Sequence, residues 1–189
     1  MIFRGAKVKP RTYWEIEAIA QALRKQCQID DMEFVPIVKM VESIAGEGFQ
    51  VVSSDEIGNN EGLTYPDRGI IQVREDVYYA ACKGEERARD TLAHELGHFL
   101  LHRSTSLARS STITVTGPLM DSEWQADEFS GLLLAPTHII IGKTAADVTK
   151  RCGVSLQTAI NRVKKSKYQP KAEPQSIAGS KENSNSDNS

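Results

Sequence analysis

Apolar side chains return every three to four positions along much of this chain, which is the spacing that gathers them on one face of an α-helix. Helix-capping signals accompany the pattern, as in Thr12 and Glu15, which form a capping box. Together these signals predict helices over residues 12–28, 36–46, 85–102, 121–135, 144–152 and 155–167.

A different pattern occupies residues 48–74, where short apolar runs alternate with turn sequences. The runs 48–54, 63–65 and 70–74 are separated by GNNEG and PDRG, whose Gly, Asn and Pro residues favour tight turns. Three short strands joined by such turns predict an antiparallel meander. The expected fold class is α+β: a small antiparallel three-stranded sheet packed on the pair of helices 85–102 and 121–135, with flanking helices.

The composition is that of an ordinary globular protein, with 40% apolar and 25% charged residues in a chain of 189. No apolar run approaches the ~20 residues that span a bilayer, and the N-terminus lacks the apolar core of a secretory signal. Cys27, Cys82 and Cys152 are scattered and form no CxxC pair, which favours reduced thiols. We therefore predict a cytoplasmic protein with no membrane partner.

The net charge of −2 conceals a basic segment near the C-terminus. Residues 143–171 contain eight Lys or Arg and a single Asp, so this segment carries +7 and the remainder −9. Its two helices meet at Gly153 and resemble a helix-turn-helix. The basic side chains make direct contact with nucleic acid conceivable, but such helix pairs also serve as scaffold or as docking surfaces for a substrate, which is the interpretation that we favour.

These patterns divide the chain into four parts. We expect an N-terminal helical segment over residues 1–34, a core over 35–142, the basic helix pair over 143–169 and a disordered tail over 170–189. The tail is rich in Lys, Glu, Pro, Ser and Asn, so it has too few apolar residues to join a core.

The sharpest chemical signal is the sequence HELGH, which starts at His94 and ends at His98 within a predicted helix. Two His four positions apart lie one turn apart on the same face, so both imidazoles can converge on one ion. The carboxylate of Glu95 is then within reach of a water on that ion, as in metalloproteases that carry the HExxH motif. The alternative is a pair of structural histidines whose hydrogen bonds are satisfied at a helix–sheet boundary.

A catalytic zinc site of this kind needs a third protein ligand. Position 104 is Ser, so the longer motif that ends in a third His is absent. The best candidate is Glu123, because Asp127 follows four residues later on the same face and can accept the free N–H of a ligand His. Glu123 also has a plainer interpretation, as an acid at the start of its helix. Glu128 is the reserve candidate, on a different face, where we expect a surface residue.

The combined motifs resemble the ImmA/IrrE family of metallopeptidases over about residues 35–165. The resemblance rests on HELGH, on the strand sequence YPDRGIIQVR, and on the pattern Glu123-x-x-Ala126-Asp127-x-Phe129-x-x-x-Leu133-Leu134-x-Pro136. The family usually has Asn where this chain has Asp127, a change that keeps a polar side chain at that position.

Membership would imply a zincin-like core over residues 35–142, with zinc bound by His94, His98 and Glu123 and with Glu95 as general base. It would also imply a cytoplasmic bacterial or phage endopeptidase that cleaves a helix-turn-helix transcriptional repressor.

The function that we predict is therefore zinc-dependent hydrolysis of a peptide bond in a protein substrate. The ligand set also suits manganese. We expect the strand 70–74 to pair with an extended segment of the substrate. The alternative is a DNA-binding or partner-binding regulator whose zinc site is structural or inert, which would have four protein ligands and no open position.

Other polar side chains are weaker candidates. His102, in the last turn of its helix, could touch the cleft, but we expect it to cap free backbone carbonyls. A donor to a transition-state oxyanion could come from His138, Tyr65, Tyr78 or Tyr79, and no pattern in the sequence chooses among them.

Overall fold

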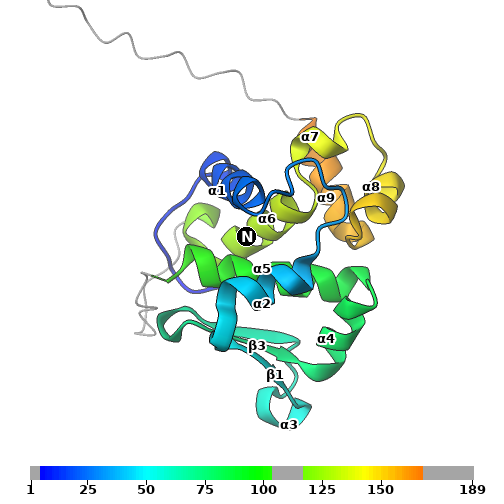
Figure 1. Cartoon of the computed structure of the whole chain (residues 1–189). Helices are drawn as coiled ribbons and strands as arrows, with labels where there is room; N and C mark the ends of the chain where they lie inside the picture. The colour runs from blue at the N-terminus through cyan, green and yellow to red at the C-terminus, as the bar shows by residue number, and fades with distance from the viewer. Residues whose placement is uncertain (1–4, 104–116, 168–189) are drawn as a thin grey trace, which may run out of the picture.

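The computed structural model describes residues 5–103 and 117–167, and within them the chain has the expected α+β class. Figure 1 shows helix α5 (Glu86–Leu101) crossing the middle of the molecule, with the sheet on one side and helices α6 (Ser122–Leu134) and α1 (Tyr13–Gln26) on the other. The helix that carries HELGH is therefore the central element of the fold. The predicted tail, residues 170–189, lies outside the described residues.

All the helices expected from the sequence are present in the described residues, with ends within two residues of the predicted ones. Besides α1, α5 and α6 they are α2 (Ile37–Ala45), α8 (Ala145–Cys152) and α9 (Leu156–Ser166). The capping box that predicts α1 is formed, because the Thr12 hydroxyl accepts from the Glu15 N–H while the Glu15 carboxylate accepts from the Thr12 N–H.

Three further helices were not predicted: α3 (Ser54–Ile57), α4 (Glu75–Cys82) and α7 (Thr137–Ile140). Helix α4 begins directly after the last residue of a strand, with no Gly or Pro to mark the change. Single 3₁₀ turns occupy Gly46–Gly48, Pro66–Arg68 and Pro118–Met120.

The sheet contains β1 (Phe49–Val52), β2 (Gly62–Tyr65) and β3 (Ile70–Arg74) in the order β1-β3-β2. Strands β2 and β3 form the predicted antiparallel hairpin, but β1 is parallel to β3, so the expectation of an all-antiparallel meander was wrong. The reason lies in residues 53–61. Ser53 and Glu56 form a capping box that starts α3, so the chain crosses over after β1 instead of turning back.

The main core lies on both sides of α5, which faces the sheet on one side and α6 on the other (Figure 1). Many of its fully buried side chains come from β3, α5 and α6, and these include Ile71, Leu92, Leu96, Phe99, Phe129, Leu132 and Leu133. Helices α5 and α6 approach closely at Gly97, where an added Cβ would lie 3.1 Å from the Phe129 ring and 3.2 Å from the Cα of Ala126. This close approach brings the HELGH face of α5 against the first turns of α6.

Three arginine side chains are almost completely buried, and their hydrogen bonds fasten distant segments to the central helices. Arg89 of α5 donates to the carbonyl oxygens of Val35 and Gly153. Burial lowers the pKa of Arg89 to about 10, so the guanidinium remains charged at neutral pH.

The other two buried arginines connect the first and last helices of the described chain to α6. Arg24 of α1 donates to the Leu133 carbonyl of α6 at 2.7 Å. Arg162 of α9 donates to the Ala135 carbonyl and to the Tyr13 hydroxyl of α1. Both ends of the described chain are thus tied to α6.

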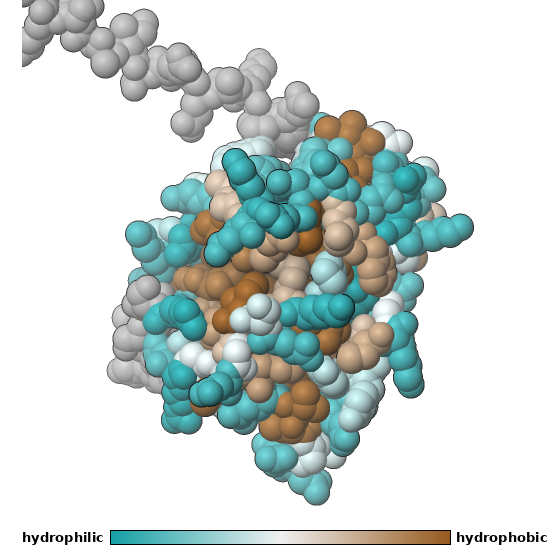
Figure 2. Space-filling view, in the orientation of Figure 1, coloured by the Kyte–Doolittle hydropathy of each residue, from teal (hydrophilic) through white to brown (hydrophobic). Residues whose placement is uncertain are grey.

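None of the helices in residues 5–103 and 117–167 is long and apolar enough to cross a membrane. The face drawn in Figure 2 is largely hydrophilic, with apolar residues in separate patches among the polar ones.

Candidate metal centre

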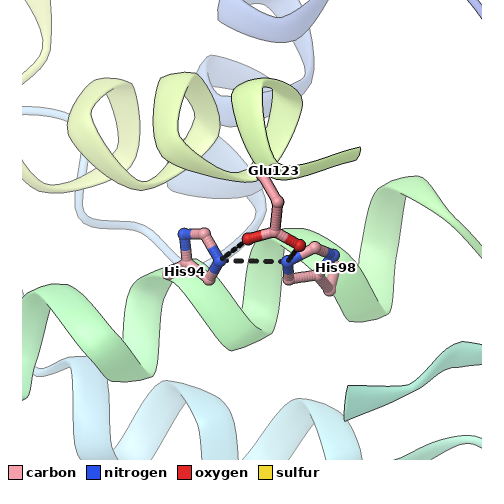
Figure 3. Close-up of side chains that lie close together, drawn as sticks. All are labelled: His94, His98 and Glu123. Atoms are coloured by element: carbon pink, nitrogen blue, oxygen red, sulfur yellow. Dashed lines mark hydrogen bonds and ion pairs between the residues drawn. The ribbon is translucent and has the colours of Figure 1, made fainter. Parts of the chain in front are cut away.

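Three side chains from α5 and α6 converge on one point. His94 and His98 lie one turn apart on α5, and Glu123 comes from the first turn of α6 and points between them (Figure 3). The Nε2 atoms of the two His are 3.0 Å apart, and the Glu123 carboxylate oxygens lie 3.2 Å from His94 Nε2 and 3.3 Å from His98 Nε2. Among the described residues, no fourth His, Cys, Asp or Glu joins this cluster.

The position of Glu123 is fixed by the way α6 begins. Asp121 is the N-cap, and its side chain accepts from the backbone N–H of Glu123 at 3.0 Å. The N-terminal segment runs alongside, because the N–H of Gly5 donates to the Asp121 carboxylate and the N–H of Ala6 donates to the Ser122 hydroxyl. The first turn of α6 is therefore held by its own N-cap and by the N-terminal segment.

Asp127 lies behind His94. Its Oδ1 atom is 2.9 Å from His94 Nδ1, so the carboxylate accepts the Nδ1 proton and Nε2 is directed toward the cluster. Burial alone would lower the pKa of His94, but hydrogen bonds to Asp127 and Glu123 outweigh it and raise that pKa to about 10. The same contacts with His94 and His98 hold the pKa of Glu123 well below its usual range.

Glu95 is 7% exposed and is held by β2 rather than by the cluster. The Thr64 hydroxyl lies 2.6 Å from Glu95 Oε2 and donates to it. Gly62 leaves the room that the side chain needs, since a Cβ there would come within 2.6 Å of Glu95 Cγ. Neither Thr64 nor Gly62 was identified from the sequence, although both lie in a predicted turn and strand just ahead of the motif.

Glu128 takes no part in the cluster and lies on another face of α6, as expected. The expectation that it is a surface residue was wrong, because its side chain is only 5% exposed. Helix α9 covers it, and Lys165 forms an ion pair with its carboxylate. The amphipathic pattern of α6 could not reveal that α9 packs over this face of the helix.

His102 is the C-cap of α5, but its ring turns back toward the site instead of capping carbonyls. Its Nδ1 lies 3.1 Å from His98 Nδ1, and its Nε2 lies 3.2 Å from Gln125 Oε1. Burial lowers the pKa of His102 to about 4. The spacing of four residues from His98 was the available signal for this contact, whereas nothing in the sequence pointed to Gln125.

A cleft of about 1090 Å³ opens over His94 and Glu95. Residues 59–62, which lead into β2, line it together with parts of α5, α6 and α9. His138, Tyr65, Tyr78 and Tyr79 do not line this cleft. The His138 ring lies 3.0 Å from the Asp30 carbonyl, and the Tyr78 hydroxyl donates to Glu42, so these two side chains have other partners.

Two His from one helix, a Glu from the next and a second Glu beside a cleft form the arrangement that zincin metallopeptidases use. Comparison with protein families gives the particular group: residues 48–164 match the family described as Peptidase_M78, IrrE N-terminal-like domain. The match covers more than half of the chain, so the protein belongs to this family of metal-dependent peptidases, and the resemblance drawn from its motifs is confirmed. Neither the curated proteins nor the solved structures contain a significant match.

Proposed function

We propose that the protein is a zinc-dependent endopeptidase. The observation that carries the proposal is the convergence of His94, His98 and Glu123 beside Glu95. Ligand atoms at about 2.0–2.2 Å from a tetrahedral zinc lie about 3.4 Å from one another. The separations of 3.0–3.3 Å between the Nε2 atoms and the carboxylate oxygens fit that spacing. Two imidazoles and one carboxylate are a usual catalytic zinc set, and manganese is the alternative ion.

A zinc ion held by His94, His98 and Glu123 would supply Lewis acidity, which would lower the pKa of a water molecule and polarise the scissile carbonyl. The Glu95 carboxylate accepts the proton of the attacking water and later gives it to the leaving amine. Because the Thr64 hydroxyl donates to Oε2, we assign the proton transfer to Oε1. Asp127 supports His94 by accepting its Nδ1 proton, which makes Nε2 a better ligand.

The substrate is proposed to add as an extended strand at β2. The sequence-based expectation that residues 70–74 pair with the substrate is wrong, since β3 is the central strand and has neighbours on both sides. The outer edge of β2 pairs with no strand in the described part of the chain. Gly62 of β2 lines the cleft beside Glu95, so a peptide added there would pass over the proposed base.

We propose a protein substrate, specifically a helix-turn-helix transcriptional repressor, and a cytoplasmic location. Support for the repressor comes from the family resemblance, and support for a peptide substrate comes from the unpaired edge of β2 and the cleft beside it. Main-chain hydrogen bonds to an edge strand do not depend on the sequence of the added peptide. Specificity would therefore come from the side chains around the cleft.

The alternative is a DNA-binding regulator that uses α8 and α9. In a helix-turn-helix the N-terminal residues of the second helix contact the bases. Here Asp90 of α5 accepts from the Ser155 N–H at 3.1 Å and from the Thr158 hydroxyl at 2.7 Å, so the start of α9 is held against α5. This contact supports a scaffold role for the pair, with α9 as a wall of the cleft.

The test is to incubate the purified protein with zinc and a set of repressors, followed by mass spectrometry of the products. We expect one discrete cut that disappears with a chelator and returns when zinc is added back. Glu95→Gln is the matched inactive variant, and it should retain zinc. A protein that holds zinc but cuts neither repressors nor an unstructured polypeptide would contradict the proposal.

A further inference from the structure

A buried chain of hydrogen bonds leads away from the metal centre behind His98. The Nδ1 atoms of His98 and His102 are 3.1 Å apart, and His102 Nε2 lies 3.2 Å from Gln125 Oε1. The Gln125 amide nitrogen then donates to the carbonyl oxygens of Lys9 at 2.8 Å and Leu119 at 2.7 Å. His102 is 1% exposed and Gln125 is 0% exposed, so water does not compete for these contacts.

The directions of these hydrogen bonds follow from the far end of the chain. Carbonyl oxygens only accept, so the Gln125 NH₂ group must face Lys9 and Leu119, and its Oε1 must face His102. Because Oε1 is an acceptor, the proton of His102 is on Nε2. A His102 ring with its proton on Nε2 presents a lone pair at Nδ1, so Nδ1 accepts and His98 Nδ1 donates.

The direction of this last hydrogen bond determines which ring nitrogen of His98 carries the proton. With its proton on Nδ1, the lone pair of the imidazole is on Nε2, the atom that faces His94 and Glu123. Each His of the cluster therefore has an acceptor for its Nδ1 proton, but the two acceptors differ. His94 donates to the half-exposed carboxylate of Asp127, whereas His98 donates to a buried neutral ring.

We propose that His102 and Gln125 are positioning residues that hold His98 in the tautomer required of a metal ligand, and that the N-terminal segment anchors them. This inference rests on the proposed metal site. The anchor consists of residues 5–11, which pair with residues 119–122: the N–H of Val8 donates to the Met120 carbonyl and the N–H of Arg11 donates to the Leu119 carbonyl. This segment lies outside residues 48–164, which match the family.

The first test examines the tautomer directly, in the full chain stripped of metal and labelled with ¹⁵N in its His rings. Long-range ¹H–¹⁵N spectra should show His102 protonated on Nε2 and not on Nδ1. A His102 ring protonated on Nδ1 would overturn the proposal. This result does not depend on zinc binding, so it stays informative even if the wild-type protein binds no zinc and the proposed function fails.

The second test measures zinc affinity by competition with a chromophoric chelator. His102→Phe keeps the ring volume but can neither accept from His98 nor donate to Gln125, and we expect a loss of about 10–100-fold. His102→Gln retains a donor and an acceptor and should recover most of that loss. Equal losses in the two variants would show that only packing matters and would overturn the proposal.

The matched control is His138→Phe, the same substitution at an exposed His with a single backbone contact. It should leave zinc affinity unchanged. Gln125→Leu should weaken zinc binding in the same direction as His102→Phe, since the His102 Nε2–H then has no acceptor. Wild-type affinity in Gln125→Leu would remove Gln125 from the proposed chain.

Discussion

Charged and titratable side chains are arranged in opposite ways in the metal centre and in the C-terminal pair of helices. At the candidate metal centre, His94, His98 and Glu123 point toward one another and could hold a cation together. In α8 and α9, three basic side chains point toward partners of the same molecule. Arg151 pairs with Glu33, Lys165 pairs with Glu128, and Arg162 is buried under carbonyl and hydroxyl oxygens.

The comparison teaches that a local count of charges says little about function until the partners are known. Of the eight basic residues in 143–171, Arg151 and Lys165 pair with acids of other elements and Arg162 is buried under oxygen acceptors, which weakens the case for nucleic acid at these three side chains. Three groups with far less formal charge, by contrast, could hold a metal ion because their ligand atoms all lie within 4.8 Å of one another.

The largest effect is expected when the two His of the metal centre are removed. The double variant His94→Ala, His98→Ala should lose nearly all of the one zinc per chain that we expect in the wild type, because a single carboxylate does not hold zinc. Elemental analysis of the purified protein measures this. His138→Ala serves as the control and should retain its zinc, and full retention in the double variant would end the assignment.

Glu95 tests whether the site is an active one. Glu95→Gln should keep zinc and lose cleavage by about 10²–10⁴-fold, because the amide cannot accept the proton of the attacking water. Rates of substrate cleavage and zinc content are measured on the same preparation. The exposed Glu47→Gln provides a control for the same chemical change, and loss of zinc in Glu95→Gln would mean that Glu95 is a ligand.

Variants of Asp127 test how much the hydrogen bond behind His94 contributes to zinc affinity. Asp127→Ala should weaken zinc binding by about 10–100-fold, because His94 Nδ1–H then loses its acceptor. Asp127→Asn should have a much smaller effect, since its amide oxygen still accepts. A chelator competition titration separates the two variants. Identical affinities for Ala and Asn would show that the carboxylate charge, rather than the hydrogen bond, matters.

The smallest effects are expected at the pair formed by Glu128 and Lys165, and they concern stability only. Lys165→Met leaves the buried carboxylate without its cation, and because Lys165 is 42% exposed and the pair is partly screened by water, the change should cost about 1 kcal/mol of unfolding free energy. Glu128→Gln should cost less, since Lys165 is half-exposed and can turn to water. Urea denaturation measures both. A change in zinc content in Glu128→Gln would instead bring Glu128 back as a candidate ligand.

Local patterns predicted most of the helices and the cluster because both depend on short spacings. The two His are four residues apart, and Glu123 and Asp127 share one helix face, so helical geometry alone places each pair. The parallel pairing of β1 depended on a crossover through α3, and α4 began without any boundary residue. Burial of Glu128 by α9 required contacts between distant elements, which one sequence does not reveal.

The support behind the cluster was even less accessible to prediction. His102 repeats the spacing of the motif, so its contact with His98 could have been anticipated. Gln125, which contacts His102, also donates to the Lys9 carbonyl 116 residues away in the sequence, and no periodicity connects such positions. Thr64 reaches Glu95 only because β2 lies at the edge of the sheet next to α5.

The buried arginines have a consequence for the smallest fragment that can fold independently. A fragment limited to residues 48–164 would retain Arg89 and Arg162 but lose two of their acceptors, the Val35 carbonyl and the Tyr13 hydroxyl. It would also lose Arg24, leaving the Leu133 carbonyl without that donor. Buried groups deprived of a partner cost about 1–3 kcal/mol each, a large share of the 5–15 kcal/mol that stabilises a typical domain. We therefore expect the segment shared with the family to be unstable on its own in this chain, and residues 13–162 are the shortest span that contains every guanidinium partner described here.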